Sequence, residues 1–386
     1  MSVKSLVAKP AEAFAPDYAI PPGETVREVM ESLELTQSEL AERTGRPKKT
    51  INEIIKGKAA ITYETALQFE RVLGVAASFW SNLEHNYQAA LARKAERERL
   101  AKQIKLLEVI PVPAMMKAGW IEKRSEPVAK LEAVLSFFGV ASAEAWQNIW
   151  GGYRTVVAFR QATEIQSDFG SVAAWLRKAE LKARSVPTKP YNAKRFKAML
   201  SEIRAMTYED REVFQPNLVA KCADAGVVVV FVRELPAIRV CGATRWLTPD
   251  KALISLTLRY KTDDQIWFTF FHEAAHILLH GKRDVFLEGV KGGSHVSIAG
   301  RAPTTAESEK QEEEANRFSR DFLIPPDAYE RFVDEGVFTD HMITAFAADI
   351  GVSPGVVVGR LQHDDKVVWQ SSLNHLKKHF SWADAD

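Results

Sequence analysis

The sequence places two histidines four residues apart, with a glutamate beside the first, in the segment His272-Glu273-Ala-Ala-His276. Residues four apart on an α-helix lie on one face, about 6 Å apart along its axis, so both imidazoles can reach one ion. Zinc suits imidazole nitrogen, and a catalytic zinc site has three protein ligands and one position left for water. Glu273 can then accept a proton from that water as a general base. The segment therefore predicts a hydrolytic Zn²⁺ site.

Two further histidines are candidates for the third ligand, and the sequence favours neither of them. His280 lies about 12 Å along the helix from His272, which is too far for both to bind one ion. We interpret His280 as a histidine at a helix end, where the helix dipole favours its charge. His295 lies in a glycine-rich stretch from which it can reach the ion, but nothing in the sequence holds it there.

A better third ligand lies in the next predicted helix. Glu312 and Asn316 are four residues apart and therefore share a helix face. A carboxylate on that face can bind the ion, while the amide accepts a hydrogen bond from a ligand histidine, as residues around metal ligands commonly do. We predict Glu312 as the third ligand and Asn316 as its supporting neighbour. We expect Glu313 and Glu314, which point elsewhere, to be solvated.

The helix that carries the histidines has a predicted start, end and buried face. Thr262-x-x-Gln265 predicts a capping box at its start, and Gly281 predicts its end. The apolar stretch Ile266–Phe271 between them would bury the helix against a sheet. The partner helix, which contains Glu312, is predicted between Thr304 and the Pro325-Pro326 pair.

A small sheet is predicted before that helix. Two or three strands are indicated by apolar, largely β-branched runs bounded by turn residues, at Val227–Val232, Arg239–Trp246 and Ala252–Leu258. A glycine-rich loop is expected after the histidine helix. We expect the edge of this sheet at Arg239–Trp246, where an extended segment would pair as an added strand.

These motifs together resemble a known family. The sequence Phe271-His-Glu-Ala-Ala-His-Ile-Leu-Leu-His280, with Glu312-x-x-Ala-Asn-x-Phe318 and Leu323-Ile-Pro325, is similar to the ImmA/IrrE metallopeptidases over roughly residues 120–370. The resemblance implies a gluzincin-like zinc peptidase with His272, His276 and Glu312 as ligands and Glu273 as base. It also implies a protein substrate, since some members cleave helix-turn-helix repressors under stress.

A second motif near the N-terminus predicts DNA binding. Leu35–Gly45 reads as a short helix capped by Thr36 and ended by glycine, and a second helix follows Arg46-Pro47. In a helix-turn-helix the second helix enters the major groove of DNA. Five basic residues and one acidic residue within 46–58 concentrate positive charge where phosphates would lie. The basic and polar side chains of this second helix are Lys48, Lys49, Asn52 and Lys56.

This N-terminal motif also resembles a family. Thr36–Gly45, Thr50–Gly57 and Ile61–Ala66 are similar to Xre-type domains, and Pro22-Gly-Glu24 with Phe79-Trp80-x-Asn-Leu83 is typical of their HigA-like antidote subgroup. The resemblance implies phosphate contacts at Gln37 and Thr50, and base contacts at Lys48, Lys49 and Asn52. It further implies a homodimer on operator DNA. A second, weaker helix-turn-helix-like pattern lies at Ile343–Ser353 and Val356–Leu361. Its only basic residue is Arg360, so we interpret this segment as a packing or substrate-docking element.

Length and composition set the remaining expectations. The 386 residues suggest two or three domains, and a net charge of +1 requires any DNA-binding charge to be local. The two cysteines cannot form a disulfide framework. No apolar run is long enough for a membrane span or signal peptide, so we expect a cytoplasmic protein.

We predict a multidomain, mainly α-helical fold, with an N-terminal all-α helix-turn-helix domain and a small α+β zincin-like domain. The predicted parts are a flexible N-terminal arm (1–18), a helix-turn-helix domain (19–82), a linker helix (83–113), a helical connector (114–205), a metallopeptidase domain (206–330) and a C-terminal helical segment (331–386).

Two functional hypotheses follow from these motifs. The first is a transcriptional regulator whose zinc endopeptidase domain cleaves a regulatory protein, such as a repressor, or this chain itself in a stress response. The alternative is a repressor or antidote in which the zinc is sensory or structural, or whose connector binds a toxin. Glu273 favours the first hypothesis, because a structural zinc site needs no base and normally closes its fourth position.

Overall fold

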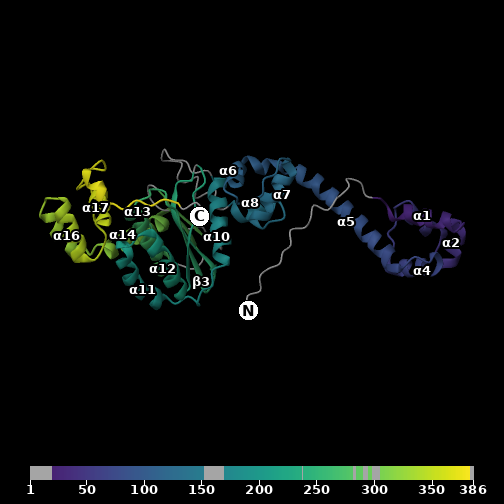
Figure 1. The fold of residues 1–386 in the computed structure, drawn as a ribbon, viewed down its shortest axis with the longest axis horizontal. Coiled ribbons are helices and arrows are strands. Elements are labelled where there is room, and N and C mark those ends of the chain that lie inside the picture. The colour runs from purple at the N-terminus through teal and green to yellow at the C-terminus, as the bar shows by residue number, and fades with distance from the viewer. Residues whose placement is uncertain are drawn as a thin grey trace. The chain divides into compact units, whose positions relative to one another are not determined.

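The computed structural model describes residues 20–151, 169–236, 238–280, 284–289, 294–297 and 305–382, with the backbone alone for 284–289, 294–297, 305, 306 and 308. The chain divides into two compact units, Met1–Lys102 and Gln103–Asp386, which are drawn in Figure 1. The expected N-terminal arm, residues 1–18, lies outside the described residues. The predicted segments 114–205, 206–330 and 331–386 all belong to the second unit.

The described part of the first unit is entirely helical, as predicted. Its helices are α1 (Pro22–Ser32), α2 (Gln37–Thr44), α3 (Lys48–Ile55), α4 (Tyr63–Leu73) and α5 (Ala77–Ala101). Thr36 caps α2 through a capping box with Glu39, and Gly45 ends this helix in the left-handed conformation with φ 66°. The predicted helix pair is therefore confirmed, with α3 starting after Pro47.

The core of the first unit fixes the orientation of α3. Ile51 and Ile54 are buried in a cluster with Leu40, Phe69 and Trp80. Helix α1 crosses the end of α3 closely, because a Cβ added at Gly23 would lie 2.2 Å from the backbone oxygen of Ile54. One face of α3 is therefore packed in the core, and the opposite face is exposed to solvent.

The second unit combines a sheet with many helices. Its helical elements are η1 (Ile104–Glu108), α6 (Val112–Lys117), α7 (Pro127–Phe138), α8 (Ala143–Trp150), α10 (Phe169–Arg184), α11 (Ala193–Ala205), η3 (Met206–Tyr208), α12 (Arg211–Asp224), α13 (Asp263–Leu279), α14 (Thr305–Leu323), α15 (Pro326–Asp334), α16 (Asp340–Ile350), α17 (Pro354–His363) and η4 (Ser372–Leu376). Its strands are β1 (Val227–Phe231), β2 (Val240–Thr248), β3 (Lys251–Leu256), β4 (Asp284–Gly289) and β5 (Ser294–Ser297). This confirms the predicted fold class, mainly helical with a small α+β domain.

The sheet has the strand order β1-β3-β2-β4-β5, in which only β1 and β3 run parallel. The three predicted strands are present, but β4 and β5 lie where we expected a glycine-rich loop. The expected edge at Arg239–Trp246 is also wrong, because Gly242 and Thr244 pair with β3 on one side and with β4 on the other. Both errors concern pairing between distant segments, which the local pattern does not encode.

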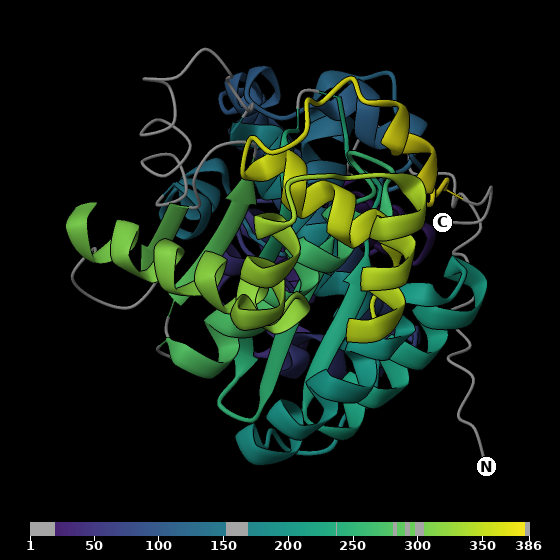
Figure 2. The same cartoon turned by 90° about the vertical axis from the view of Figure 1, so that its left-hand side faces the viewer.

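Helix α13 is the central element of this unit's core. Its aromatic side chains Trp267, Phe270 and Phe271 are fully buried in a cluster that extends from Phe196 to Phe380. Helix α17 packs against α13, and Figure 2 shows the C-terminal helices in yellow on the viewer's side of the unit. Helix α13 is therefore packed against elements that precede it in the chain and against elements that follow it.

The start of α13 is anchored by carboxylates rather than by the predicted capping box. Thr262 is the N-cap residue, but its side chain caps no backbone group. Asp263 and Asp264 are buried there and contact α17, where a Cβ at Gly355 or Gly359 would come within 2.6 Å of their oxygens. The predicted end at Gly281 and the predicted start of α14 at Thr304 lie outside the described residues.

Core packing explains the apolar residues of the C-terminal helix-turn-helix-like pattern. Val356, Val357 and Leu361 of α17 are buried, as the packing interpretation predicts. No single helix in the described parts of the chain is long and apolar enough to cross a membrane. Helices α16 and α17 together meet the length and composition requirement, but they are bent by 109°.

Candidate metal centre and nucleic-acid interface

Helices α13 and α14 bring the three predicted ligands together. The ligand atoms of His272, His276 and Glu312 all lie within 4.8 Å of one another, and each of the three residues is at most 5% exposed. The two histidine Nε2 atoms are 2.9 Å apart. The Glu312 oxygens lie 3.3 Å from His272 Nε2 and 3.7 Å from His276 Nε2.

These donors fit a small cation. Ligands about 2.1 Å from zinc in a tetrahedral site are about 3.4 Å from one another, which lies within the observed range of separations. Both carboxylate oxygens of Glu312 are buried and accept no hydrogen bond from the described residues. An ionised carboxylate is costly to bury without a compensating charge or hydrogen bond, and a bound cation supplies that charge.

Asn316 makes the contact that the sequence spacing predicts. Its Oδ1 atom lies 3.0 Å from Nδ1 of His272. With the amide oxygen as acceptor, His272 donates its Nδ1 proton and keeps the lone pair of Nε2 for an ion. One helix, α14, therefore supplies both a candidate ligand and the residue that orients another.

Glu273 is fully buried between α13 and β2. A Cβ added at Gly242 of β2 would lie 2.8 Å from Glu273 Oε1 and 2.9 Å from its Cγ. Thr244 donates a hydrogen bond from Oγ1 to the backbone oxygen of Glu273 at 3.1 Å. Strand β2 therefore contacts the Glu273 carboxylate and also binds the backbone of α13 at Glu273.

Two sequence interpretations around this site need correction. His280 is more than a helix-end histidine, because its side chain is 3% exposed and its Nδ1 lies 2.9 Å from His276 Nδ1. Glu314 is not simply solvated, because its carboxylate lies 3.2 Å from His280 Nε2. Glu313 is exposed and lies 3.7 Å from Arg317, as expected for a surface carboxylate. His295 lies in β5, and its side chain is outside the described residues.

Four residues contribute to this site although the sequence did not predict that they would. Gly242 and Thr244 left no local signal, because their contact with Glu273 depends on how β2 packs against α13. His280 and Glu314 did leave a signal. His272, His276 and His280 recur every four residues, which places their side chains in one row along the helix.

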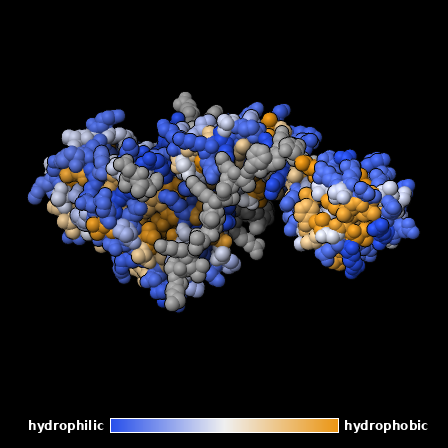
Figure 3. Space-filling view, turned by 45° about the vertical axis from the view of Figure 1, so that its right-hand side comes forward, coloured by the Kyte–Doolittle hydropathy of each residue, from blue (hydrophilic) through white to orange (hydrophobic). Residues whose placement is uncertain are grey.

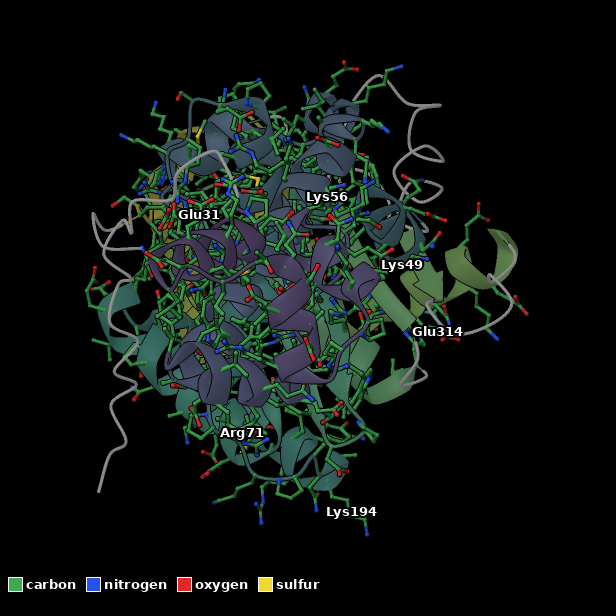
Figure 4. All side chains as sticks on the ribbon, turned by 90° about the vertical axis from the view of Figure 1, so that its right-hand side faces the viewer. Glu31, Lys49, Lys56, Arg71, Lys194 and Glu314 are labelled. Atoms are coloured by element: carbon green, nitrogen blue, oxygen red, sulfur yellow. The ribbon has the colours of Figure 1, made fainter. Side chains whose placement is uncertain are left out.

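The first unit exposes the residues predicted to contact DNA. Lys48 and Lys49 are exposed on α3, Lys56 is exposed just after it, and the Lys49 side chain retains 84% of its surface. Lys49 and Lys56 are labelled in Figure 4. Thr50 and Asn52 are partly exposed on the same helix, and Gln37 is partly exposed at the start of α2. The lysine side chains of this segment are therefore exposed to solvent, although Lys49 also lies 3.8 Å from Glu53.

Comparison with known proteins agrees with this division. Residues 26–80 match the helix-turn-helix family, and residues 253–362 match the IrrE N-terminal-like domain. An uncharacterized HTH-type transcriptional regulator of Escherichia coli K12, YddM, is 30% identical over 73 residues, which are 19% of this chain and 78% of that protein. This chain belongs to the HTH-type transcriptional regulators. Its second unit carries a peptidase domain of the ImmA/IrrE type, so both resemblances seen in the sequence are confirmed.

Solved structures of antidote proteins are also similar to part of the chain. The Pseudomonas aeruginosa antitoxin HigA, solved with the higBA promoter, is 28% identical and covers 21% of this chain and 90% of its own, with a TM-score of 0.21. A HigA-family addiction module antidote protein from Coxiella burnetii is 28% identical and covers 22% of this chain and 94% of its own, with a TM-score of 0.21.

Proposed function

We propose that this regulator binds operator DNA through its first unit and acts through its second unit as a zinc-dependent endopeptidase in a stress response. The substrate would be a regulatory protein such as a repressor, or this chain itself. The observation that carries the proposal is the convergence of His272, His276 and Glu312 in a buried cluster beside Glu273. Three ligands and a neighbouring base suit hydrolysis, whereas a structural zinc site normally has four protein ligands.

The residues of the site have separate tasks in this proposal. His272, His276 and Glu312 would hold Zn²⁺, which when bound polarises the scissile carbonyl and lowers the pKa of water. Glu273 accepts a proton from the attacking water and delivers it to the leaving amine. Burial of Glu273 strengthens these electrostatic interactions, because the surrounding protein screens charge less than water does.

The first unit would dock α3 in the major groove of double-stranded DNA. Lys48, Lys49 and Asn52 would reach base edges, while Gln37 and Thr50 contact phosphates and Lys56 adds positive charge. Their exposure on one helix pair supports this assignment. Because this contact is with operator DNA, we propose that the protein acts in the cytoplasm.

We propose that the protein binds its operator as a homodimer, since two copies would read two half-sites. Exposed apolar side chains support an interface on the first unit. Leu33, Leu67 and Phe79 are each close to half exposed, and Figure 3 shows an apolar area on this unit. Contiguous apolar surface of this kind commonly marks a protein interface.

Glu273→Gln tests the enzymatic part of the proposal. The substitution keeps the size of the side chain and removes the proton acceptor, which typically costs roughly 10²–10⁴-fold in rate. We expect the variant to bind zinc and DNA like the wild type and to leave one cellular protein uncut. Comparative proteomics of stressed cells that carry either form would identify that protein.

His272→Ala and His276→Ala are the matched controls, because they remove ligands instead of the base. We expect these two variants to lose both zinc and cleavage. A stress phenotype that requires both histidines but survives Glu273→Gln would show that the zinc is sensory or structural.

A further inference from the structure

His280 lies one turn beyond His276, at the C-terminal end of α13, and its ring is buried against its neighbour. The ring centroids are 5.0 Å apart, and the two Nδ1 atoms are 2.9 Å apart. On its other side, His280 Nε2 lies 3.2 Å from Oε2 of Glu314. The side chains of His276, His280 and Glu314 therefore form a continuous row of hydrogen-bonding groups.

The chemistry of these groups determines where the protons sit. An ionised carboxylate only accepts hydrogen bonds, so His280 donates its Nε2 proton to Glu314. Neutral His280 then has a lone pair on Nδ1, and His276 must donate its own Nδ1 proton to it. This tautomer of His276 leaves its Nε2 lone pair directed at Glu312, where the other candidate ligands meet.

Helix α14 thereby orients both ligand histidines from one side. Asn316 holds His272 directly, through the contact between Oδ1 and Nδ1. Glu314 reaches His276 through His280, which contacts both of them. The ligand Glu312 and the two orienting residues thus lie within two turns of one helix, which couples the position of α14 to the geometry of the whole site.

We propose that His280 and Glu314 are positioning residues of the metal centre, which fix the tautomer and ring orientation of His276. The inference rests on the metal centre of the proposed function and adds two residues to it. Neither His280 nor Glu314 belongs to the cluster of possible ligands, which in the described chain consists of His272, His276 and Glu312.

Glu314 offers a clean substitution, because its side chain is 40% exposed and its loss leaves no closed cavity. Glu313 is the matched control. It lies on the same helix, carries the same charge, is 59% exposed and pairs with Arg317 instead of a histidine. Each carboxylate also pairs with a basic residue four positions away, Glu314 with Lys310 and Glu313 with Arg317. Alanine at either position therefore removes one such pair, and a difference between the two variants reports the contact with His280.

The experiment measures Zn²⁺ affinity of the full chain by competition with a chromophoric chelator. We expect His280→Ala and Glu314→Ala to weaken binding roughly 10- to 100-fold, the usual loss for partners of metal ligands. Glu313→Ala should bind like the wild type. His280→Gln should recover most of the affinity, because its amide offers both an acceptor for His276 and a donor for Glu314. Absorption spectra of Co²⁺-loaded protein should shift in the two weakened variants.

The outcomes separate this inference from the proposed function. If the wild type binds zinc and both His280→Ala and Glu314→Ala match it in affinity and Co²⁺ spectrum, the positioning role is wrong and the metal centre stands. If the wild type binds no zinc, both fail. Should His280→Ala not fold, as judged by circular dichroism, Glu314→Ala against Glu313→Ala decides the question alone.

Discussion

The two helices that carry the candidate sites, α3 and α13, place their polar side chains in opposite environments. On α3 the candidate DNA contacts face solvent, with the Lys49 side chain 84% exposed. On α13 the candidate catalytic residues are enclosed, with His272 1% and Glu273 0% exposed. A solvent-facing side chain needs only a helix that is held in place, whereas an enclosed polar side chain also needs partners from other elements.

The neighbours of each helix reflect this difference. The functional face of α3 depends on apolar packing behind it, through Ile51 and Ile54. The buried polar side chains of α13 depend instead on polar partners. These partners come from β2, from α14 and from His280, which follows the last residue of α13. Substitutions on α3 should therefore remove single contacts, whereas substitutions around α13 should change the site as a unit.

The largest effect is expected from removing a ligand. Glu312→Ala should weaken zinc binding roughly 10³-fold, because structural zinc sites bind with about 10–16 kcal/mol shared among their ligands. Wild-type protein should carry about one zinc per chain, measured by metal analysis. Glu314→Ala should retain far more zinc than Glu312→Ala. Equal retention by the two variants would contradict the ligand assignment.

The corresponding change on α3 should act on DNA alone. Replacing Lys48 and Asn52 together with alanine should weaken operator binding roughly 10²-fold, since each contact contributes about 1–3 kcal/mol. Zinc content should stay at the wild-type level. Gel shifts at fixed salt concentration would measure the loss. Unaltered specificity would assign recognition to another part of the chain.

A change on β2 should test how tightly the base is enclosed. Gly242→Ala would place a Cβ 2.5 Å from Thr269 Cγ2 and 2.8 Å from Glu273 Oε1, so both side chains must move. We expect cleavage to slow roughly 10- to 10²-fold, because small misplacements of catalytic groups cost rates of that order. Zinc content should be unchanged, and cleavage assays with metal analysis would show both.

Gly359→Ala is the control for this overpacking. The Cβ added at Gly359 of α17 crowds Asp264. Asp264 lies on α13, as Glu273 does, but about 13 Å away from it along the helix axis. Both substitutions should lower the free energy of unfolding by about 1–3 kcal/mol. A comparable loss of cleavage in both would mean that crowding of α13 anywhere disturbs the site, and Gly242 would have no specific role.

The smallest effect concerns the two helix starts. Helix α3 begins at Lys48, after Pro47, without a side-chain cap, whereas α13 begins at Asp263, whose pKa burial raises to about 6. Ser353 and Lys378 donate hydrogen bonds to this carboxyl, and Asp264 paired with Lys377 lies beside it. The folded state thus binds a proton more strongly than the unfolded chain, so this group lowers the free energy of unfolding as pH rises from about 4 to about 6.

Asp263→Asn should remove that pH dependence. The variant should gain about 2 kcal/mol in stability relative to the wild type between pH 4.5 and pH 7. Chemical unfolding of both proteins at the two pH values measures this difference. A constant difference between them would show that Asp263 titrates normally.

Local patterns were enough to predict much of both regions. The four-residue spacing of His272 and His276 and of Glu312 and Asn316 follows from helical geometry, which is the same in any fold. The capping of α2 by Thr36 depends only on residues within one turn. The buried strand β1 is a continuous apolar run that needs no partner to be recognised. These features were predictable because the interactions that create them join residues close together in the chain.

Other features were decided only when distant segments packed together. Strands β4 and β5 form by pairing with β2 and with each other, so β2 has partners on both sides. Gly242 borders Glu273, Glu314 reaches His276 through His280, and Asp263 is buried against α17. The sequence by itself determined which side chains could bind a metal and move a proton. The tertiary structure decided their orientation, partners and enclosure, because these depend on contacts between residues that are tens of positions apart.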